Sequence, residues 1–568
     1  MVKDEAALDW KVSTADANEE PRNKKIASES KTDDLGEVVD RISNLPQPIT
    51  HHIMSFLPTK DAARSSVLSK RWRYLWVSFP ILDFDQSDFE MDLSQSVDAF
   101  KIQDLFLTYL ENYIQHRESV VKIDKFRLRA EVFLQADSRI NSVIDWALEH
   151  GVKQLDLDLI NQNCLPYNWP NSLCPKESVT SLKLGTFNLD LHDLLLVFPS
   201  LQELVLRGCK VLKDIECLGA NLKTLALDEC EGFRSIKIES CNLQSFLYYA
   251  NPHNQGTVTL IACTFLKVLS LRNVGIEDKW LEHHISELVH LEDLTLDCCF
   301  ELRVVNLFHG KLKRLSLLRC KKFVEVGIDC PKLYCFTYAG EIVTFGSLNS
   351  SSHLNATLIL SRNQTKGWFV KLRRLLSLFD HCKVLSLVCK SYQDLIIPEY
   401  GKDDFLPPLH DLKHLKVECH STIEDYIKLV DDLLWFSPHL ETLSIVSMVV
   451  ESGREVVNSL DAPNHKTGDP DVMEPSYCKK KLDFKFQYKK LLAEDEDSFC
   501  CVMHPKECWQ HRLKKVMINS FDGSVHDDKK NLLKYFSENG KILESIQNDS
   551  QVFGVLQGKY FEQSTILS

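Results

Sequence analysis

The sequence lacks the features that mark a membrane protein or an exported protein. No apolar run in its 568 residues approaches the roughly 18 residues needed to span a bilayer. The first ten residues, MVKDEAALDW, are charged where an export signal would be apolar. We therefore expect a protein of the cytoplasm and/or nucleus with no membrane partner. Its 19 cysteines should then be reduced thiols rather than disulfides.

Positive charge and catalytic motifs are also missing. The formal net charge is −13, which opposes binding to phosphate backbones, so we expect no nucleic-acid partner. The sequence contains no GxxxxGK[ST], GxGxxG, HExxH or GxSxG, the motifs of nucleotide, metalloprotease and hydrolase sites. These absences predict a non-catalytic protein without a cofactor.

What the sequence does contain is a short stretch dense in apolar residues, LPQPITHHIMSFLPTKDAARSSVLSKRWRYLW at residues 45–76. The pattern predicts a first helix with Ile49 and Ile53 on one face. Thr59 and Ser69 are placed to cap two further short helices. The segment that holds these three helices, each of about two turns, is shorter than the roughly 40 residues that a chain usually needs to fold unaided. Apolar surface is therefore left over for a partner.

This stretch resembles the F-box in the form common in plant proteins. The resemblance rests on Leu45-Pro46, Ile49, Ile53, Phe56-Leu57-Pro58, Asp61, Ser69-Lys70-Arg71-Trp72 and Trp76. It implies that the segment binds the Skp-family adaptor of an SCF ubiquitin ligase, and through that adaptor a cullin. The implied adaptor-binding residues are Leu45, Pro46, Ile49, Ile53, Leu57, Pro58 and Trp72. The alternative is a helical cap on the neighbouring domain.

A repeat follows the F-box-like segment. Five stretches share the template LxxLxLxx(C/N/V), and three of the four steps between their starts are 21, 25 and 21 residues, a period typical of leucine-rich repeats. LQSFLYYAN at 243 fills the one longer gap. They are LQELVLRGCKVL (201–212), LKTLALDECEGF (222–233), LKVLSLRNVGI (266–276), LEDLTLDCCFEL (291–302) and LKRLSLLRCKKF (312–323). Weaker copies start at 152, 179, 333, 382, 412 and 440. A polar stretch at 341–353 is expected to interrupt the period.

Each repeat should contribute one strand to a curved parallel sheet. Alternate side chains of a strand point in opposite directions, so Leu204 and Leu206 should enter the core while Arg207 faces out. Four cysteines lie three residues after the last strand leucine and should pack as small buried side chains, not as metal ligands, because no Cys-x-x-Cys pair is present. They are Cys209, Cys230, Cys299 and Cys320.

The outward positions of these strands are the candidate substrate site. They give six candidate substrate-binding residues: Arg207, Asp228, Tyr249, Arg272, Asp297 and Arg314. Arginine and aspartate alternate, whereas a polyphosphate would need clustered cations, so a protein substrate is favoured. A middle column suits a peptide with one apolar end, because it turns from apolar to polar along Val205, Ala226, Leu247, Ser270, Thr295 and Ser316.

The C-terminal region allows two interpretations. CCVMHPKECWQH (500–511) holds residue types that bind zinc, closely spaced. The favoured interpretation starts from Cys508, Leu513, Val516, Ile518, Phe521 and Gly523, continued by Leu532, Leu533, Tyr535, Phe536 and Leu543-Glu544. These residues resemble the FBD module found at the end of many plant F-box proteins, and they require only a strand, a glycine turn and an amphipathic helix. We therefore expect no metal site.

The predicted fold class is α/β, a three-helix F-box followed by a leucine-rich-repeat solenoid and a small C-terminal α/β FBD module. The predicted segments are a flexible leader (1–37), the F-box (38–83), the repeat solenoid (84–449), a mobile linker (450–481), the FBD-like module (482–546) and a tail (547–568). The order resembles plant F-box/LRR/FBD proteins.

Three functions are compatible with these observations. The resemblance implies a non-catalytic substrate-recognition subunit of an SCF-type ubiquitin ligase, with an unknown protein substrate on the concave repeat face. The first alternative is a scaffold that binds the adaptor but delivers nothing for degradation. The second is a receptor that holds a small molecule in the solenoid, as certain related plant proteins do.

Overall fold

The computed structural model describes most of residues 42–447 and parts of the chain beyond them. Within that span it leaves out residues 43–44, 58, 91–97, 116, 118–121, 134–136, 162–164, 171–174, 217–220, 240–241, 252–255, 362–366, 399–404 and 422. Beyond it, the described residues are 512–520, 535–536, 543, 545–548, 551–556 and 559–562. The chain divides into two compact units, Met1–Phe56 and Leu57–Ser568. The predicted leader (1–37) and linker (450–481) lie outside the described residues.

The first unit contains one described helix, α1 (Gln47–Met54). Pro46 is its N-cap residue and Pro48 lies in its first turn, where a missing N–H costs no hydrogen bond. The Thr50 hydroxyl donates a hydrogen bond to the Pro46 carbonyl at 3.2 Å. The first of the three predicted F-box helices is therefore present.

The second unit begins with the other two predicted helices, α2 (Thr59–Arg64) and α3 (Lys70–Val77), joined by the short 3₁₀ helix η1 (Ser65–Val67). Ser69 caps α3 as predicted, since its hydroxyl accepts a 3.2 Å hydrogen bond from the Trp72 N–H. The Thr59 hydroxyl instead accepts a 2.9 Å hydrogen bond from the Asp83 N–H, which ties α2 to the first strand of the following sheet.

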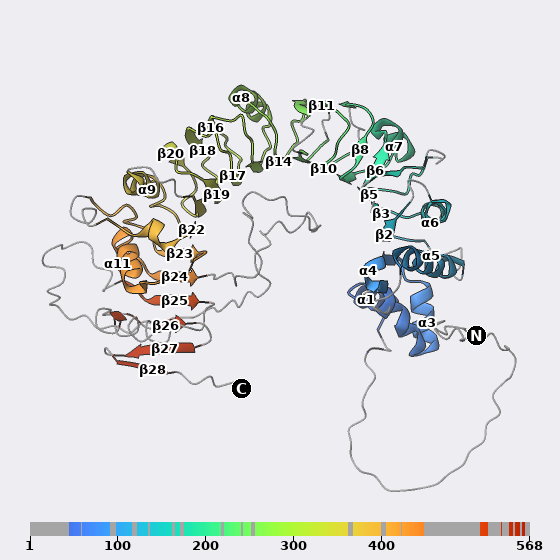
Figure 1. Cartoon of the computed structure of the whole chain (residues 1–568), viewed down its shortest axis with the longest axis horizontal. Helices are drawn as coiled ribbons and strands as arrows, with labels where there is room; N and C mark the ends of the chain where they lie inside the picture. Colours follow the sequence, from blue (N-terminus) through green and yellow to red (C-terminus); the bar gives the residue numbers. More distant parts are fainter. Residues whose placement is uncertain are drawn as a thin grey trace, which may run out of the picture. The chain divides into compact units, whose positions relative to one another are not determined.

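A long sheet of 19 strands makes up most of the second unit (Figure 1). All neighbouring strands up to β26 pair in parallel, and β26, β27 and β28 pair antiparallel. In spatial order the strands are β1 (Ile81–Asp85), β2 (Lys125–Val132), β3 (Gln154–Asn161), β5 (Ser181–Gly185), β7 (Glu203–Arg207), β10 (Thr224–Asp228), β12 (Ser245–Tyr249), β14 (Val268–Arg272), β15 (Asp293–Asp297), β17 (Arg314–Leu318), β19 (Cys335–Gly340), β21 (Asn355–Leu360), β22 (Val384–Cys389), β23 (His414–Cys419), β24 (Thr442–Ser447), β25 (Lys515–Ser520), β26 (Ser545–Asn548), β27 (Gln551–Leu556) and β28 (Lys559–Glu562).

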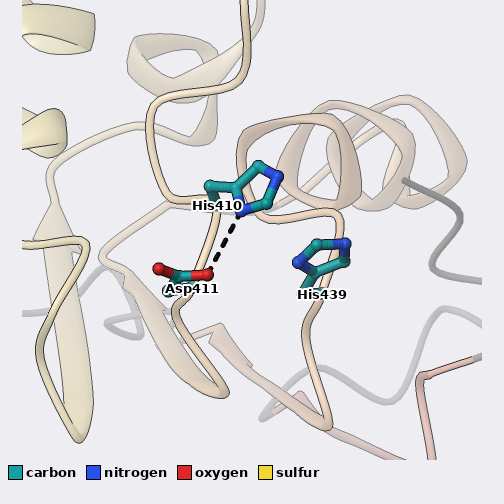
Figure 2. Close-up of side chains that lie close together, drawn as sticks. All are labelled: His410, Asp411 and His439. Atoms are coloured by element: carbon teal, nitrogen blue, oxygen red, sulfur yellow. Dashed lines mark hydrogen bonds and ion pairs between the residues drawn. The ribbon is translucent and has the colours of Figure 1, made fainter. Parts of the chain in front are cut away.

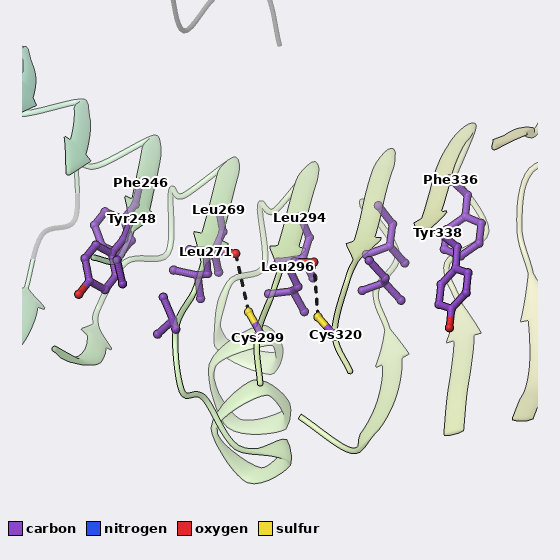
Figure 3. Packing of buried hydrophobic residues seen from close by; sticks show 14 of the residues in the cluster. Phe246, Tyr248, Leu269, Leu271, Leu294, Leu296, Cys299, Cys320, Phe336 and Tyr338 are labelled. Atoms are coloured by element: carbon purple, nitrogen blue, oxygen red, sulfur yellow. Dashed lines mark hydrogen bonds between the residues drawn. The ribbon is translucent and has the colours of Figure 1, made fainter. Parts of the chain in front are cut away.

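The repeat leucines form two ladders of buried side chains across this sheet, as the template predicts (Figure 3). One ladder runs through Leu204, Leu225, Phe246, Leu269, Leu294, Leu315 and Phe336. The other runs through Leu206, Leu227, Tyr248, Leu271, Leu296, Leu317 and Tyr338. Because the ladders cross consecutive strands, the core is continuous along the stack. Burial of each such side chain contributes about 1.5–3 kcal/mol to the stability of the fold.

Helices and three small parallel sheets cover the core side of the long sheet (Figure 1). The small sheets are β4 (Tyr167–Asn168), β6 (Phe187–Leu189) and β8 (Lys210–Val211); β9 (Ile215–Glu216), β11 (Ser235–Glu239) and β13 (Thr257–Ile261); and β16 (Val304–Phe308), β18 (Glu325–Asp329) and β20 (Thr344–Asn349). The helices are α4 (Gln86–Glu90), α5 (Ala99–Gln115), α6 (Ser138–Glu149), α7 (Leu191–Val197), α8 (Asp278–Glu287), α9 (Trp368–Ser377), η2 (Tyr392–Leu395) and α11 (Tyr426–Phe436). Among the described residues, no helix combines the length and the apolar character that crossing a membrane requires.

The stretch at 341–353 does not interrupt the repeat, which corrects the prediction. It contains β20, which pairs in parallel with β18 across one register shift between Val326 and Ile328, whereas β18 pairs with β16 without a shift. The next strand of the long sheet, β21, aligns Ala356 with Phe336, only 20 residues earlier. The template missed this repeat because an alanine occupies its first core position.

The C-terminal part also differs from the prediction of a separate module and a tail. β25 pairs in parallel with β24, so Val516 and Ile518 extend the two core ladders of the repeats. Within the predicted tail, β27 and β28 add two antiparallel strands. Their sequences, QVFGVL and KYFE, are rich in β-branched and aromatic residues, a strand signal that the prediction overlooked. Within 482–546 the described residues are 512–520, 535–536, 543 and 545–546, and among them Leu513, Phe536 and Leu543 are buried.

Candidate functional site

The first unit exposes an apolar stripe on α1. Ile49 is 48% exposed, Ile53 39% and Phe56, just past the helix end, 75%. Their spacing of four and three residues places them on one face. Pro46 is exposed and Leu45 is half-buried. An apolar stripe left in solvent is the expected mark of a protein-binding helix.

In the second unit, some residues of the predicted F-box segment are exposed and others pack into the core. Leu57 is exposed and Trp72 is half-buried, while Pro58 lies outside the described residues. Leu75 is buried, and the Trp76 ring packs 5.6 Å from the Tyr113 ring of α5. This face of α3 is therefore used by the repeat domain itself. Three further large apolar side chains of the segment are exposed: Val67, Leu68 and Tyr74.

The second candidate surface is the face of the long sheet turned away from the leucine core, here called the open face. The strand register confirms the predicted column, because Arg207, Asp228, Tyr249, Arg272 and Asp297 are direct neighbours on consecutive strands. The sheet therefore brings together five residues that are spread over about four repeats of the sequence.

Asp297 is the centre of an ion-pair cluster on this face. Only 6% of the residue is exposed. The Arg319 Nε donates a 2.8 Å hydrogen bond to Asp297 Oδ1, and the Arg319 Nη2 pairs with Oδ2. The Arg272 Nε lies 3.4 Å from the same Oδ2. Asp297 therefore holds two arginines in place and offers little of itself to a partner. Arg319 lies just past its strand, outside the predicted columns, and was missed for that reason.

Tyr249 and Arg314 are better placed to contact a partner. Burial raises the pKa of the half-buried Tyr249, whose hydroxyl accepts a long, 3.5 Å hydrogen bond from the Ser270 hydroxyl. Arg314 is exposed at the first position of β17, and its Nε donates a 2.7 Å hydrogen bond to Asp293. Both side chains are held in place while part of their surface stays in solvent.

Charges also alternate on the first strands of the open face. Arg127 of β2 lies 3.2 Å from Asp83 of β1, and Arg129 lies 3.6 Å from Asp158 of β3. Burial raises the pKa of Asp156, and the Arg207 and Arg127 guanidinium groups offset part of that rise. Cations here are matched by carboxylates on neighbouring strands, although the sequence-based prediction of alternating charges concerned only the strands from β7 onward.

The middle column does not provide the apolar end that was expected. Val205 and Ala226 are only 3% and 7% exposed, and Ser270 is buried as well. Leu247 between them is half-buried. The interpretation as a binding strip for one apolar peptide end is therefore corrected.

Sequence reasoning missed an apolar column farther along the open face. It runs through Leu318, Ala339, Ile359 and Val388, in register on β17, β19, β21 and β22. Beside it, a hydroxyl column runs through Ser316, Thr337, Thr357 and Ser386. Leu318, Ile359 and Val388 are half-buried. Continuing the columns into the weaker repeat copies would have found both.

The four template cysteines serve the turns after the strands. Each is buried, and its thiol donates to a backbone carbonyl of the preceding repeat, as Cys230 does to Leu206 at 3.4 Å. Figure 3 shows the same contact for Cys299 and Cys320. Burial raises the pKa of Cys230. These cysteines are packing residues, as predicted, while the residues at 500–511 lie outside the described part.

A hollow of about 330 Å³ lies on the opposite side of the long sheet, between α8 and the turn after β13. Its lining includes His284 and Glu287 but no lysine or arginine. Burial lowers the pKa of His284, which keeps its ring neutral near pH 7. The hollow is therefore poorly suited to a phosphate-bearing ligand.

Two family models match the chain. The model of the F-box domain matches residues 42–84. A model described as the At1g61320/AtMIF1 LRR domain matches residues 251–467. The first covers the stretch with the exposed helix α1, and the second covers the later repeats of the long sheet.

Curated proteins of Arabidopsis thaliana are similar as well. The chain is 32% identical over 311 residues to the F-box/LRR-repeat protein At3g58900, a match that covers 54% of this chain and 74% of the relative. It is 33% identical over 197 residues to the F-box/LRR-repeat protein At3g59200, covering 31% of this chain and 36% of the relative. It is 25% identical over 225 residues to the F-box/FBD/LRR-repeat protein At2g26030, covering 36% and 47%. The chain thus spans less than half the length of the last two relatives.

Proposed function

Since the chain belongs to the F-box/LRR-repeat proteins, we propose that it is the substrate-recognition subunit of an SCF-type ubiquitin ligase. Its F-box binds the Skp-family adaptor and, through it, a cullin. The open face of the repeat sheet holds a protein that is to be ubiquitinated. In this role the chain is a non-catalytic specificity subunit that works in the cytoplasm and/or nucleus.

One observation carries the adaptor-binding half of this function. The matched F-box region leaves Ile49, Ile53 and Phe56 in solvent on one face of α1. Each such side chain contributes about 1.5–3 kcal/mol when it is buried. Burial of the stripe by a partner would therefore contribute enough free energy for a stable complex. A helical cap that packed only on its own chain would not need an apolar stripe in solvent.

The composition of the open face supports a protein as the other partner. It combines a half-buried tyrosine, arginines held by carboxylates, and a column of half-buried apolar side chains beside hydroxyl groups. Tyrosine and arginine are the residues most often found as interface hot spots. Paired charges lower the cost of ordering these side chains on binding. A polyphosphate would find Arg272, Arg314 and Arg319 already paired with carboxylates.

The FBD module stays a prediction. FBD appears in the names of two relatives, At2g26030 and At4g03220, and β25 gives the strand that the resemblance requires. Because β25 continues the long sheet, this segment is a further candidate for substrate contact rather than a part that folds by itself.

The test is affinity capture of bound proteins from plant cells in which degradation is blocked. Four forms of the full chain are compared: wild type, Ile53→Asp, the double variant Tyr249→Ala/Arg272→Ala, and the matched control Phe308→Ala/Lys237→Ala. The control removes an exposed aromatic residue and an exposed cation from the small sheets on the opposite side of the long sheet.

The substrate-recognition function predicts separate losses. Ile53→Asp should lose the adaptor and cullin but retain and accumulate the substrate. The open-face double variant should lose the substrate and retain the adaptor, and the control should keep both. A scaffold would show no protein that accumulates when degradation is blocked. Capture that is unaffected by the open-face variant but lost on deletion of residues 500–546 would move recognition to the C-terminal segment.

A further inference from the structure

Three metal-binding side chains converge near the C-terminal end of the described repeats (Figure 2). They are His410, Asp411 and His439, and one donor atom from each lies within 4.8 Å of the other two. The His410 Nδ1 lies 3.2 Å from Asp411 Oδ1, and the two imidazole rings meet edge to face with their centroids 4.3 Å apart. None of these residues belongs to the surfaces discussed above.

Two consecutive repeats supply this cluster. His410 and Asp411 precede β23, and His439 precedes β24, so each donor is carried on the turn that enters a strand of the long sheet. Both turns are anchored by the core, since Leu409, Leu412 and Leu440 are fully buried. The donor side chains, by contrast, are half-buried or exposed and can be reached from solvent.

Backbone hydrogen bonds fix the two turns with respect to each other. The Leu409 N–H donates to the Phe436 carbonyl at 3.0 Å, and the Glu441 N–H donates to the Lys413 carbonyl at 2.8 Å. The Asp411 N–H donates to the Asp380 carboxylate at 2.5 Å, from the repeat before. The donor groups are therefore attached to backbone that is already in place before any ion binds, the condition under which a metal site gains affinity.

The chemistry of the donors fits zinc. Zn²⁺ takes imidazole nitrogen at about 2.0–2.1 Å and carboxylate oxygen at about 2.0–2.2 Å, usually in tetrahedral geometry. Donors around such an ion lie about 3.3 Å from one another by that geometry. The pair formed by His410 and Asp411 already has this spacing. A ring nitrogen of His439 lies within 4.8 Å of both, so the third ligand is close to this spacing.

We propose that His410, Asp411 and His439 form a Zn²⁺ site that links two neighbouring repeats. Three protein ligands leave one coordination position for water or for a donor from a bound protein. The Asp411 side chain is 77% exposed, so that position opens toward solvent. The site is independent of the proposed ligase function. Its ligands come from turns 29 residues apart in sequence, a spacing that no compact zinc motif has, which is why the sequence predicted no metal here.

The test uses the full chain, stripped of metal by a chelator and then titrated with Zn²⁺ against a chromophoric competitor. The ligand variants are His439→Ala and Asp411→Asn, and circular dichroism checks their folding. Two variants serve as controls. His381→Ala removes an exposed histidine from the turn of the preceding repeat, where its Nε2 pairs with Ser350 at 2.7 Å. Cys508→Ala removes a possible ligand at 500–511.

The expected result is one zinc ion per chain in the wild type and both controls, with affinity weakened at least roughly tenfold in each ligand variant. Cobalt(II) added in place of zinc should give visible absorption bands that His439→Ala removes. The proposal is overturned if the wild type binds no zinc, because His410 and Asp411 then form an ion pair only. It is equally overturned if zinc is retained by His439→Ala or is lost from Cys508→Ala.

Discussion

Arg319 and Asp297 face each other from neighbouring repeats, joined by a 2.8 Å hydrogen bond from the Arg319 Nε to Asp297 Oδ1 and a second contact from Nη2. Arg319 has a left-handed backbone, with φ of 54°, directly after β17. That conformation costs a non-glycine residue roughly 1–2 kcal/mol. Here it directs the guanidinium back toward the end of the previous strand. A turn residue thus neutralises the most buried carboxylate of the open face.

Arg319→Ala should lower the free energy of unfolding by about 1–3 kcal/mol, because the buried Asp297 then loses its better aligned cation and keeps Arg272, whose Nε lies 3.4 Å away. Alanine shares the left-handed strain of arginine, so the change isolates the guanidinium. The matched control is Arg314→Ala, which breaks a half-exposed ion pair with Asp293 and should cost less than about 1 kcal/mol. Urea unfolding followed by circular dichroism measures both. Equal losses would contradict the assigned role of Arg319.

Cys230→Ser should destabilise the repeat core by about 1–3 kcal/mol. The thiol is fully buried and donates to the Leu206 carbonyl at 3.4 Å. The shorter C–O bond of serine draws the donor away from that carbonyl and leaves a hydroxyl partly unsatisfied in the core. The control is Cys335→Ser, a half-buried position on the open face that should change stability by no more than about 0.5 kcal/mol. A stability of Cys230→Ser equal to wild type would show that the turn tolerates a hydroxyl.

Stability should fall as the pH is lowered from about 7 to about 5.5. Burial is the main cause that lowers the pKa of three histidines in the folded chain: His284, His309 and His414. Below the unfolded value near 6.5 the unfolded chain therefore binds more protons than the folded chain, and protonation favours unfolding. Carboxyl groups with raised pKa values, such as Asp156, act in the opposite direction only at lower pH.

The variant that tests this pH effect is His284→Gln. It should reduce the difference between the urea midpoints at the two pH values, since a buried imidazole no longer titrates. His283→Gln is the control, because His283 is exposed on the same helix, 3.7 Å from Glu287. A His284→Gln chain with an unchanged pH dependence would assign the effect to other groups.

The apolar column of the open face should contribute to substrate binding. Ile359→Asp or Val388→Asp places a charge among half-buried side chains that a protein partner would cover, and should weaken capture of the substrate at least roughly tenfold. Val324→Asp, at an exposed apolar residue beside the small sheet of β18, is the control. Quantitative affinity capture measures all three. Unchanged capture by both open-face variants would restrict recognition to the strands around Tyr249.

The repeat architecture could be predicted because its signal is periodic and redundant. Each LxxLxL unit alternates core and surface positions, and many copies confirm one another, so Leu204 and Leu206 are placed correctly from sequence alone. Where the pattern weakens, prediction fails. Ala356 in place of leucine hid the repeat at β21, and the strands β27 and β28 carry no leucine template at all.

The candidate site could be predicted in its columns but not in its contacts. Register follows from the repeat, so the neighbours of Tyr249 and Arg272 were known. Residues outside the strands decide which side chains of the open face are buried. Arg319 reaches Asp297 from a turn, and the sequence gives no signal for that reach. The cluster of His410 and His439 exists only once two turns of the stack lie side by side.

The most direct test of the central claim is a titration of the purified Skp-family adaptor into the full chain, with Kd measured by calorimetry. We predict that Ile53→Asp binds at least roughly tenfold more weakly than wild type, because a charge then replaces an apolar side chain of the α1 stripe. Ile427→Asp, at an isoleucine of nearly equal exposure on α11, and the double variant Tyr249→Ala/Arg272→Ala should both bind like wild type. Wild-type affinity in a folded Ile53→Asp chain, or no binding by the wild type, would contradict the account.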